Sequence, residues 1–242
     1  MSRNNQDRMG GPVPQSEEPP QNNPLLNFVK PTQFVELPSK GKGYPEGHPL
    51  KNKESIEIFH MTAKDEDILT SETLIKQGVV LDRFIENILV DKSIKLDSLL
   101  IGDKNSILVE SRILGYGADY NAEMVCPNCF TNCKINYDLS NRSLHYGSEQ
   151  EADSSGYYSI TLPESGVQLK VKLLTSEDEA MMIKRNVETK KKKSTNSLVT
   201  DQYKLMIVSA NGITDKPQVN QFVEMMPLKD SIVLKKFYKQ IT

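Results

Sequence analysis

Apolar and polar residues alternate along several short stretches of the chain, and this pattern predicts short strands. Residues 55–62 form the first such stretch, and a short strand is also predicted at the start of the folded region, from Phe34. Residues 119–125 and 134–139 lead into and out of a cysteine-rich turn, and residues 157–163 and 167–174 flank the turn Glu164-Ser165-Gly166. Period two is typical of half-buried strands, so the sequence predicts two hairpins and at least two further strands.

Helical spacing predicts the remaining elements. Thr62 to Asp65 and Ser71 to Thr73 are helix-start signals, and Gly78 is a stop signal. Apolar residues recur at helical spacing over 79–90, and Asp103 is expected to cap a helix that ends at Gly115 and Gly117. Helices are also expected over 176–188, 197–210 and 228–241. The last has Ile232, Val233, Phe237 and Ile241 on its apolar side.

Together these elements predict an α+β protein with four regions. Residues 1–33 hold six of the thirteen prolines, so they form an extended or disordered N-terminal arm. An α+β domain with a cysteine knuckle is expected over 34–140, a polar linker over 141–156, and a hairpin with helices over 157–242. The arm is either a disordered tail or a segment that orders along a partner through Leu25, Leu26 and Phe28.

Composition narrows the class of protein. The 242 residues are 37% hydrophobic and 26% charged, with 30 Lys and Arg against 32 Asp and Glu. A net charge of -2 disfavours general binding to nucleic acid. No apolar run approaches the roughly 20 residues that span a bilayer, and the first residues do not predict a secretory signal.

Three cysteines lie within eight positions, as Cys126-Pro-Asn-Cys129-Phe-Thr-Asn-Cys133. A CxxC between two strands is one half of a zinc ribbon, since its turn presents two thiolates to one cation. Cys133 is the expected third ligand of a structural zinc, and His145 is the expected fourth. His60 or a ligand from another chain remains an alternative, as does a knuckle of reduced thiols without metal. The odd number of cysteines disfavours a disulfide framework, and the strand flanks disfavour a thioredoxin-like redox site.

The loop from Ser39 to Pro49 combines glycines, which permit positive φ, with prolines, which fix φ. It lacks the spacing of a phosphate-binding P-loop, so we expect a stiff loop that contacts a partner. Its partner-binding residues would be Gly41, Gly43, Pro45, Gly47 and Pro49, with His48 in a packing role. The carboxylates at 65–67 are expected to favour a helix start, and the lysines at 190–193 to be solvated. No set of residues predicts a catalytic triad, and no enzymatic activity is expected.

Several segments together resemble one known family. In the order and spacing of these segments, the chain resembles the baseplate proteins of T4-like contractile-tailed bacteriophages. The segments are residues 34–50, the strand with the helix start at 55–71, and the run 99–120 that leads into CPNC. Members of this family are usually labelled baseplate hub subunits. The resemblance covers roughly residues 34–140 and is weaker beyond. Phe130 stands where family members commonly have glycine, and Cys133 is an addition.

The resemblance implies a virion protein of the tail baseplate, synthesised in the host bacterial cytoplasm, which contacts other tail proteins and catalyses no reaction. No small-molecule substrate and no membrane are implied as partners. An assembly factor absent from the mature virion is the first alternative. A zinc-ribbon regulator that binds nucleic acid is the second, and the net charge disfavours it.

Overall fold

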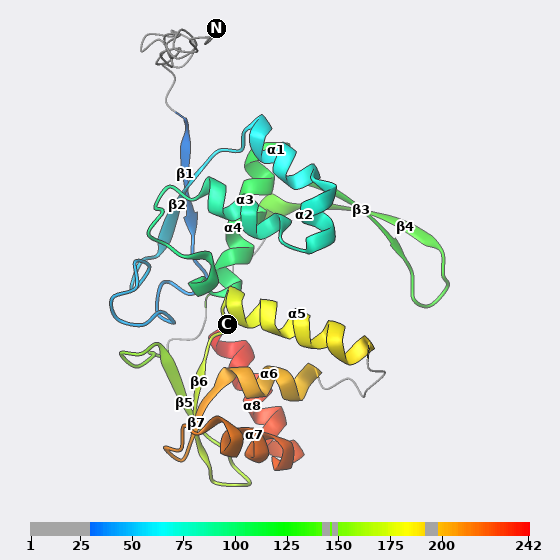
Figure 1. Cartoon of the computed structure of the whole chain (residues 1–242). Coiled ribbons are helices and arrows are strands. Elements are labelled where there is room, and N and C mark those ends of the chain that lie inside the picture. The colour runs from blue at the N-terminus through cyan, green and yellow to red at the C-terminus, as the bar shows by residue number, and fades with distance from the viewer. Residues whose placement is uncertain (1–29, 142–145, 147–149, 192–197) are drawn as a thin grey trace, which may run out of the picture. The chain divides into compact units, whose positions relative to one another are not determined.

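A computed structural model describes residues 30–141, 146, 150–191 and 198–242 (Figure 1). This part of the chain contains eight α-helices and seven strands in small antiparallel sheets, which confirms the α+β prediction. Residues Pro31–Thr242 form one compact unit. The expected boundaries at 34–140, 141–156 and 157–242 stay predictions. The Pro-rich arm, including Leu25, Leu26 and Phe28, lies outside the described residues.

The first strands and helices follow the predicted order. Strands β1 (Thr32–Glu36) and β2 (Ser55–Phe59) pair antiparallel, and helices α1 (Ala63–Thr70), α2 (Glu72–Gln77) and α3 (Val80–Ile88) follow. Helix α1 starts where the sequence predicted a helix start, and Thr62 and Asp65 form a capping box there. Gly78 adopts the left-handed conformation that ends α2.

Helix α4 (Ile101–Tyr116) starts earlier than the sequence predicted. Its N-cap is Leu100, so the expectation that Asp103 caps this helix was wrong. Asp103 instead lies in the first turn, fully buried, and binds a loop that packs on the helix. The short helix η3 (Leu96–Ser98) precedes α4. Gly117 ends α4 as expected, whereas Gly115, also expected at its end, lies within the helix.

Strands β3 (Asp119–Val125) and β4 (Asn132–Asp138) form the predicted cysteine hairpin, a separate two-stranded sheet. A short helix, η4 (Leu139–Asn141), follows β4. In Figure 1 the two strands extend from the end of α4 as an isolated ribbon.

The C-terminal region contains a three-stranded sheet and four helices. Strands β5 (Tyr157–Thr161) and β6 (Gln168–Lys172) form the second predicted hairpin, and β7 (Ile207–Ala210) pairs with β6. The helices are α5 (Ser176–Lys191), α6 (Leu198–Met206), α7 (Lys216–Met225) and α8 (Leu228–Ile241).

Two expectations for this region were wrong. A helix was expected through residue 210, but α6 ends at Met206. Residues Ile207 to Ala210 instead form a strand that pairs with the free edge of β6. Ile232 was expected on the buried side of α8 and is 46% exposed, while Leu234 fills that side together with Phe237 and Ile241.

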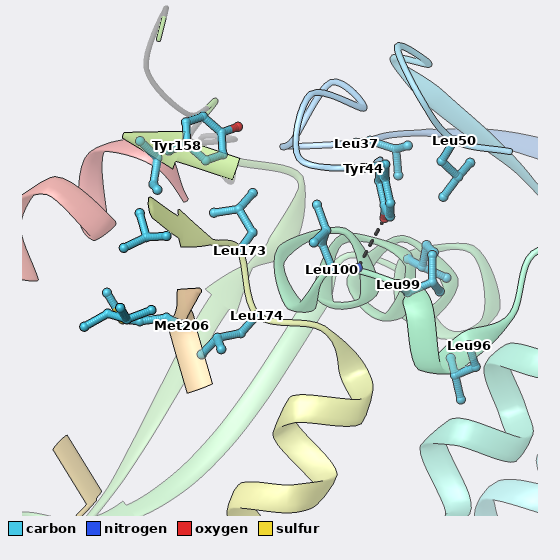
Figure 2. Packing of buried hydrophobic residues seen from close by; sticks show 14 of the residues in the cluster. Leu37, Tyr44, Leu50, Leu96, Leu99, Leu100, Tyr158, Leu173, Leu174 and Met206 are labelled. Atoms are coloured by element: carbon cyan, nitrogen blue, oxygen red, sulfur yellow. Dashed lines mark hydrogen bonds between the residues drawn. The ribbon is translucent and has the colours of Figure 1, made fainter. Parts of the chain in front are cut away.

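One hydrophobic core joins the elements before and after the ribbon (Figure 2). Leu99 and Leu100, which precede α4, are buried with Leu173 and Leu174, which follow β6. Two backbone bonds fasten these segments, from the N–H of Ile101 to Leu174 and from the N–H of Ser176 to Leu99. No helix in the described residues is both long and apolar enough to cross a bilayer.

Candidate functional site

The β3–β4 ribbon exposes both of its faces. None of its strand residues is buried: most are exposed and three are half-buried. In the described part of the chain, helix α4 reaches the base of the ribbon through Arg112, and the strands extend away from it (Figure 1). An isolated two-stranded hairpin is marginally stable in water, and a sheet normally buries its apolar face. The ribbon is therefore the element whose local structure most clearly calls for a partner.

The cross-strand register separates the ribbon into two unlike faces, because successive residues of a strand point to opposite sides. One face carries the pairs Tyr120–Tyr137, Ala122–Ile135 and Met124–Cys133, and the other carries Asp119–Asp138, Asn121–Asn136, Glu123–Lys134 and Val125–Asn132. We call the first set the apolar face of the ribbon. It contains no charged side chain, and Met124 on it is 51% exposed.

The base of the ribbon is fastened to helix α4 through Arg112. Its guanidinium donates to the carbonyl oxygens of Gly117 and Asp119, at 3.0 and 3.4 Å. The same group lies over the rings of Tyr116 and Tyr120, 4.8 and 5.9 Å from their centroids. These contacts fix the direction in which the ribbon leaves the helix.

The tip of the ribbon is a tight turn that holds the cysteines. The N–H of Cys126 donates to Thr131, and the N–H of Phe130 donates back to Cys126, both at 2.9 Å. Phe130 has a φ of 55° and is 79% exposed. A bulky residue in the left-handed region costs about 1 kcal/mol or more and is typical of functional turns.

The three thiols differ in their surroundings. Cys129 is exposed, while Cys126 and Cys133 are half-buried. Hydrogen bonds from the hydroxyl and the backbone N–H of Thr131, and a further one from Cys126, lower the pKa of the Cys129 thiol. A lowered thiol pKa favours the thiolate, which is the form that binds metals.

The predicted zinc ligands are only partly described. Among the residues that the structure describes, no group of three or more His, Cys, Asp or Glu side chains is arranged to hold a metal ion. His145 lies outside the described residues, and His60 follows β2 on a different sheet. Zinc bound by Cys126, Cys129, Cys133 and His145 stays a prediction.

The Ser39–Pro49 loop packs on the start of α4 through a buried polar cluster. Asp103 accepts hydrogen bonds from the backbone N–H and the hydroxyl of Ser39, at 3.1 and 2.6 Å, and from the hydroxyl of Tyr44, at 2.8 Å. Tyr44 in turn accepts from the N–H of Leu100 at 3.2 Å (Figure 2). Burial raises the pKa of the Asp103 carboxyl, and the bonds from Ser39 and Tyr44 oppose that shift. The cluster holds the loop in place.

The five loop residues proposed from sequence for partner binding do not share one environment. Gly41 is buried and has a φ of 72°, with its Cα facing the backbone of residues 50–53. Gly43 faces the side chain of Leu173. Pro45 and Gly47 are exposed, and Pro49 is half-buried. A partner can reach the middle of this loop more readily than its start.

His48 has the packing role that its position suggested. Its ring stacks on Tyr44 at 4.3 Å, its Nδ1 accepts from the N–H of Leu50 at 3.1 Å, and its Nε2 lies 2.9 Å from the Ser98 hydroxyl. Because Nδ1 is the acceptor, the ring is neutral and Nε2 carries the proton. Burial lowers the pKa of His48.

Among the carboxylates expected at the helix start over 65–67, that of Asp65 has a structural role. Its carboxylate is fully buried and accepts from the N–H and the hydroxyl of Thr62 and from Asn87. The lysine run at 190–193 falls largely outside the described residues.

Comparison with known proteins places the chain in a family. An extended ribbon with an uncovered apolar face is typical of a protein that works through contacts with other proteins. The model of a family described as "T4 bacteriophage base plate protein" matches residues 30–242, and the chain belongs to this family. This confirms the resemblance seen in the sequence and extends it over the C-terminal half. No curated protein and no solved structure matches the chain.

Proposed function

We propose that the protein is a structural subunit of the hub or inner part of a contractile-tail baseplate, and that it acts by contact without catalysis. Membership of the baseplate family supports the tail as its place of action. The observation that carries the contact role is the uncovered apolar face of the β3–β4 ribbon. Its neighbours would be other tail proteins.

The contact role agrees with the way the chain uses its buried polar groups. Asp65 stabilises the start of α1 through hydrogen bonds, and Asp103 binds the Ser39–Pro49 loop to α4. Asp230 accepts from the N–H groups of Glu164 and Ser165 in the turn between β5 and β6. Both oxygens of each of these carboxylates accept hydrogen bonds from donors of the same chain, which is what a structural role requires.

Mass spectrometry of purified virions tests this proposal against the assembly-factor alternative. A structural subunit is present in a fixed ratio to the known baseplate proteins, whereas an assembly factor is found in precursors and lost from mature particles. Presence in a constant ratio across preparations supports the proposal. Absence from intact virions, with presence in assembly intermediates, would overturn it.

A further inference from the structure

Helix α8 is held by the core on one side and exposed along the other. Leu234 and Phe237 are buried in the core. The hydroxyl of Tyr238 accepts from the N–H of Leu174 at 3.0 Å, and Asp230 is bonded to the turn between β5 and β6. These contacts fix the helix, so its opposite face is presented to solvent as a rigid surface.

The exposed face of α8 has an apolar end and a basic end. Positions 228, 232, 235 and 239 lie on one side of the helix, because they are spaced by four, three and four residues, and they span about 16 Å. The apolar side chains at the start are largely exposed, Leu228 by 76% and Met225, at the end of α7, by 70%. Exposed lysines follow toward the end of the helix. We call this set the α8 stripe, which consists of Met225, Leu228, Ile232, Lys235, Lys236 and Lys239.

The basic end of the α8 stripe has no counter-charge in the described part of the chain. None of its three lysines forms an ion pair there, whereas Lys229 on the same helix pairs with Glu164 at 3.2 Å. A cation in the last turn interacts favourably with the helix dipole, which accounts for Lys239. That effect falls off within one turn, so it leaves Lys235 and Lys236 unexplained.

We propose that the α8 stripe is a second contact surface, which binds a segment of another tail protein with apolar side chains at one end and carboxylates at the other. The proposal rests on the contact role given above and names the chemistry of one partner. The carboxylates pair with the lysines of the stripe, and the apolar side chains cover Leu228 and its neighbours. A reversed segment would leave the lysines unpaired and place carboxylates on apolar side chains, so the stripe also selects one direction.

The arrangement of charge favours this occupant over others. A second copy of α8 would bring lysines against lysines or against apolar side chains, and both contacts are unfavourable. A membrane-bound helix buries an apolar face along its whole length, but that face of α8 lies in the core. Nucleic acid would pair with the lysines and leave Met225 and Leu228 exposed. An acidic protein segment with apolar residues satisfies both ends.

Carbodiimide cross-linking of purified tails tests the proposal, because this reagent joins an amine directly to a carboxylate that touches it. If tails lack the protein, the assembly intermediates that contain it are used instead. We expect peptides in which Lys235, Lys236 or Lys239 is joined to Asp or Glu of one other tail protein, with apolar residues near those acids in its sequence. Absence from tails would overturn the structural-subunit role, whereas these cross-links in the intermediates would still support the α8 stripe.

Charge reversal gives an independent measurement. Lys235→Glu with Lys239→Glu changes the stripe, and Lys64→Glu with Lys95→Glu is the matched control on exposed lysines of other segments. We expect the first pair to lower incorporation by about fivefold or more, because attractive pairs become repulsive. The control should stay within about twofold of wild type. Lysine in place of the cross-linked acids of the partner should restore incorporation of the first variant.

Both variants should keep the helical circular dichroism and the thermal midpoint, since none of the substituted lysines is buried. Other results would overturn the proposal. These are wild-type incorporation of the charge-reversed stripe, cross-links only to a second copy of this chain, or equal labelling of the stripe lysines by an amine-reactive reagent in the assembly and in the isolated protein. Protection of these lysines that nuclease treatment removes would assign the stripe to nucleic acid instead.

Discussion

Tyr120 and Tyr137 lie directly opposite each other across the β3–β4 ribbon, and their side chains are 44% and 49% exposed. A cross-strand aromatic pair contributes roughly 0.2–1 kcal/mol to a hairpin. The pair therefore helps the ribbon to hold its shape while leaving much of its aromatic surface open. That combination suits an element that must be formed before its partner arrives.

The hydroxyl of Tyr44 is expected to stabilise the whole core. Tyr44→Phe removes one donor to the buried Asp103 and one acceptor for the N–H of Leu100. We expect the free energy of unfolding to fall by about 1–3 kcal/mol in urea titrations. Tyr116→Phe, on an exposed residue, is the control and should change stability by less than about 0.5 kcal/mol. Equal stability of both variants would show that the cluster does not hold the loop.

Substitutions at two glycines of the Ser39–Pro49 loop test whether packing makes this loop rigid. A Cβ at Gly41 would collide with the backbone of Leu50, Asn52 and Lys53, whereas one at Gly47 would meet open space. Both glycines have positive φ, so each alanine adds a strain of about 1 kcal/mol. We expect Gly41→Ala to lower the thermal midpoint clearly more than Gly47→Ala does. Similar midpoints would mean that the start of the loop is free to move.

Because the His48 ring is neutral in the folded protein, we expect the free energy of unfolding to depend on pH. Its pKa is lowered in the folded protein, so the unfolded chain takes up the proton more readily, and stability falls as the pH drops below about 6.5. At pH 7.5 we expect His48→Gln to cost roughly 0.5–1.5 kcal/mol through loss of the stacking and the bond from Leu50. Urea unfolding of both proteins from pH 7.5 to pH 5 measures the difference. It should shrink as the pH falls, and a constant or growing difference would refute the assigned tautomer.

The sequence predicted those elements whose signals are local. The Thr62–Asp65 capping box, the stop at Gly78 and the two hairpins each depend on residues a few positions apart. Asp103 was misjudged because its partners, Ser39 and Tyr44, are about sixty residues away. Ile207 to Ala210 were misjudged because only the open edge of β6 makes them a strand.

The candidate site was predicted in part for the same reason. The spacing of the cysteines and the alternation around them predicted the hairpin and its thiol turn. The same alternation predicts strands with one apolar face, but it does not tell whether the chain covers that face. The uncovered state of Met124 and its neighbours emerges only from the arrangement of the other elements.

The apolar face of the ribbon is the surface through which we expect the protein to join the baseplate. Met124→Ser with Ile135→Ser makes that face polar, and Asn121→Ser with Asn136→Ser is the control, with the same number of substitutions on the opposite face and no loss of apolar surface. Neither pair lies in the core, so both variants should keep the unfolding midpoint of the main transition.

Quantitative mass spectrometry of tails purified from phage that carry each variant is the most direct test. We predict that the Met124–Ile135 variant is present at about one-tenth of the wild-type amount per tail or less, which corresponds to a loss of at least about 1.4 kcal/mol in binding. The Asn121–Asn136 variant should stay within about twofold of wild type, which corresponds to about 0.4 kcal/mol. Wild-type incorporation of the Met124–Ile135 variant would contradict the account.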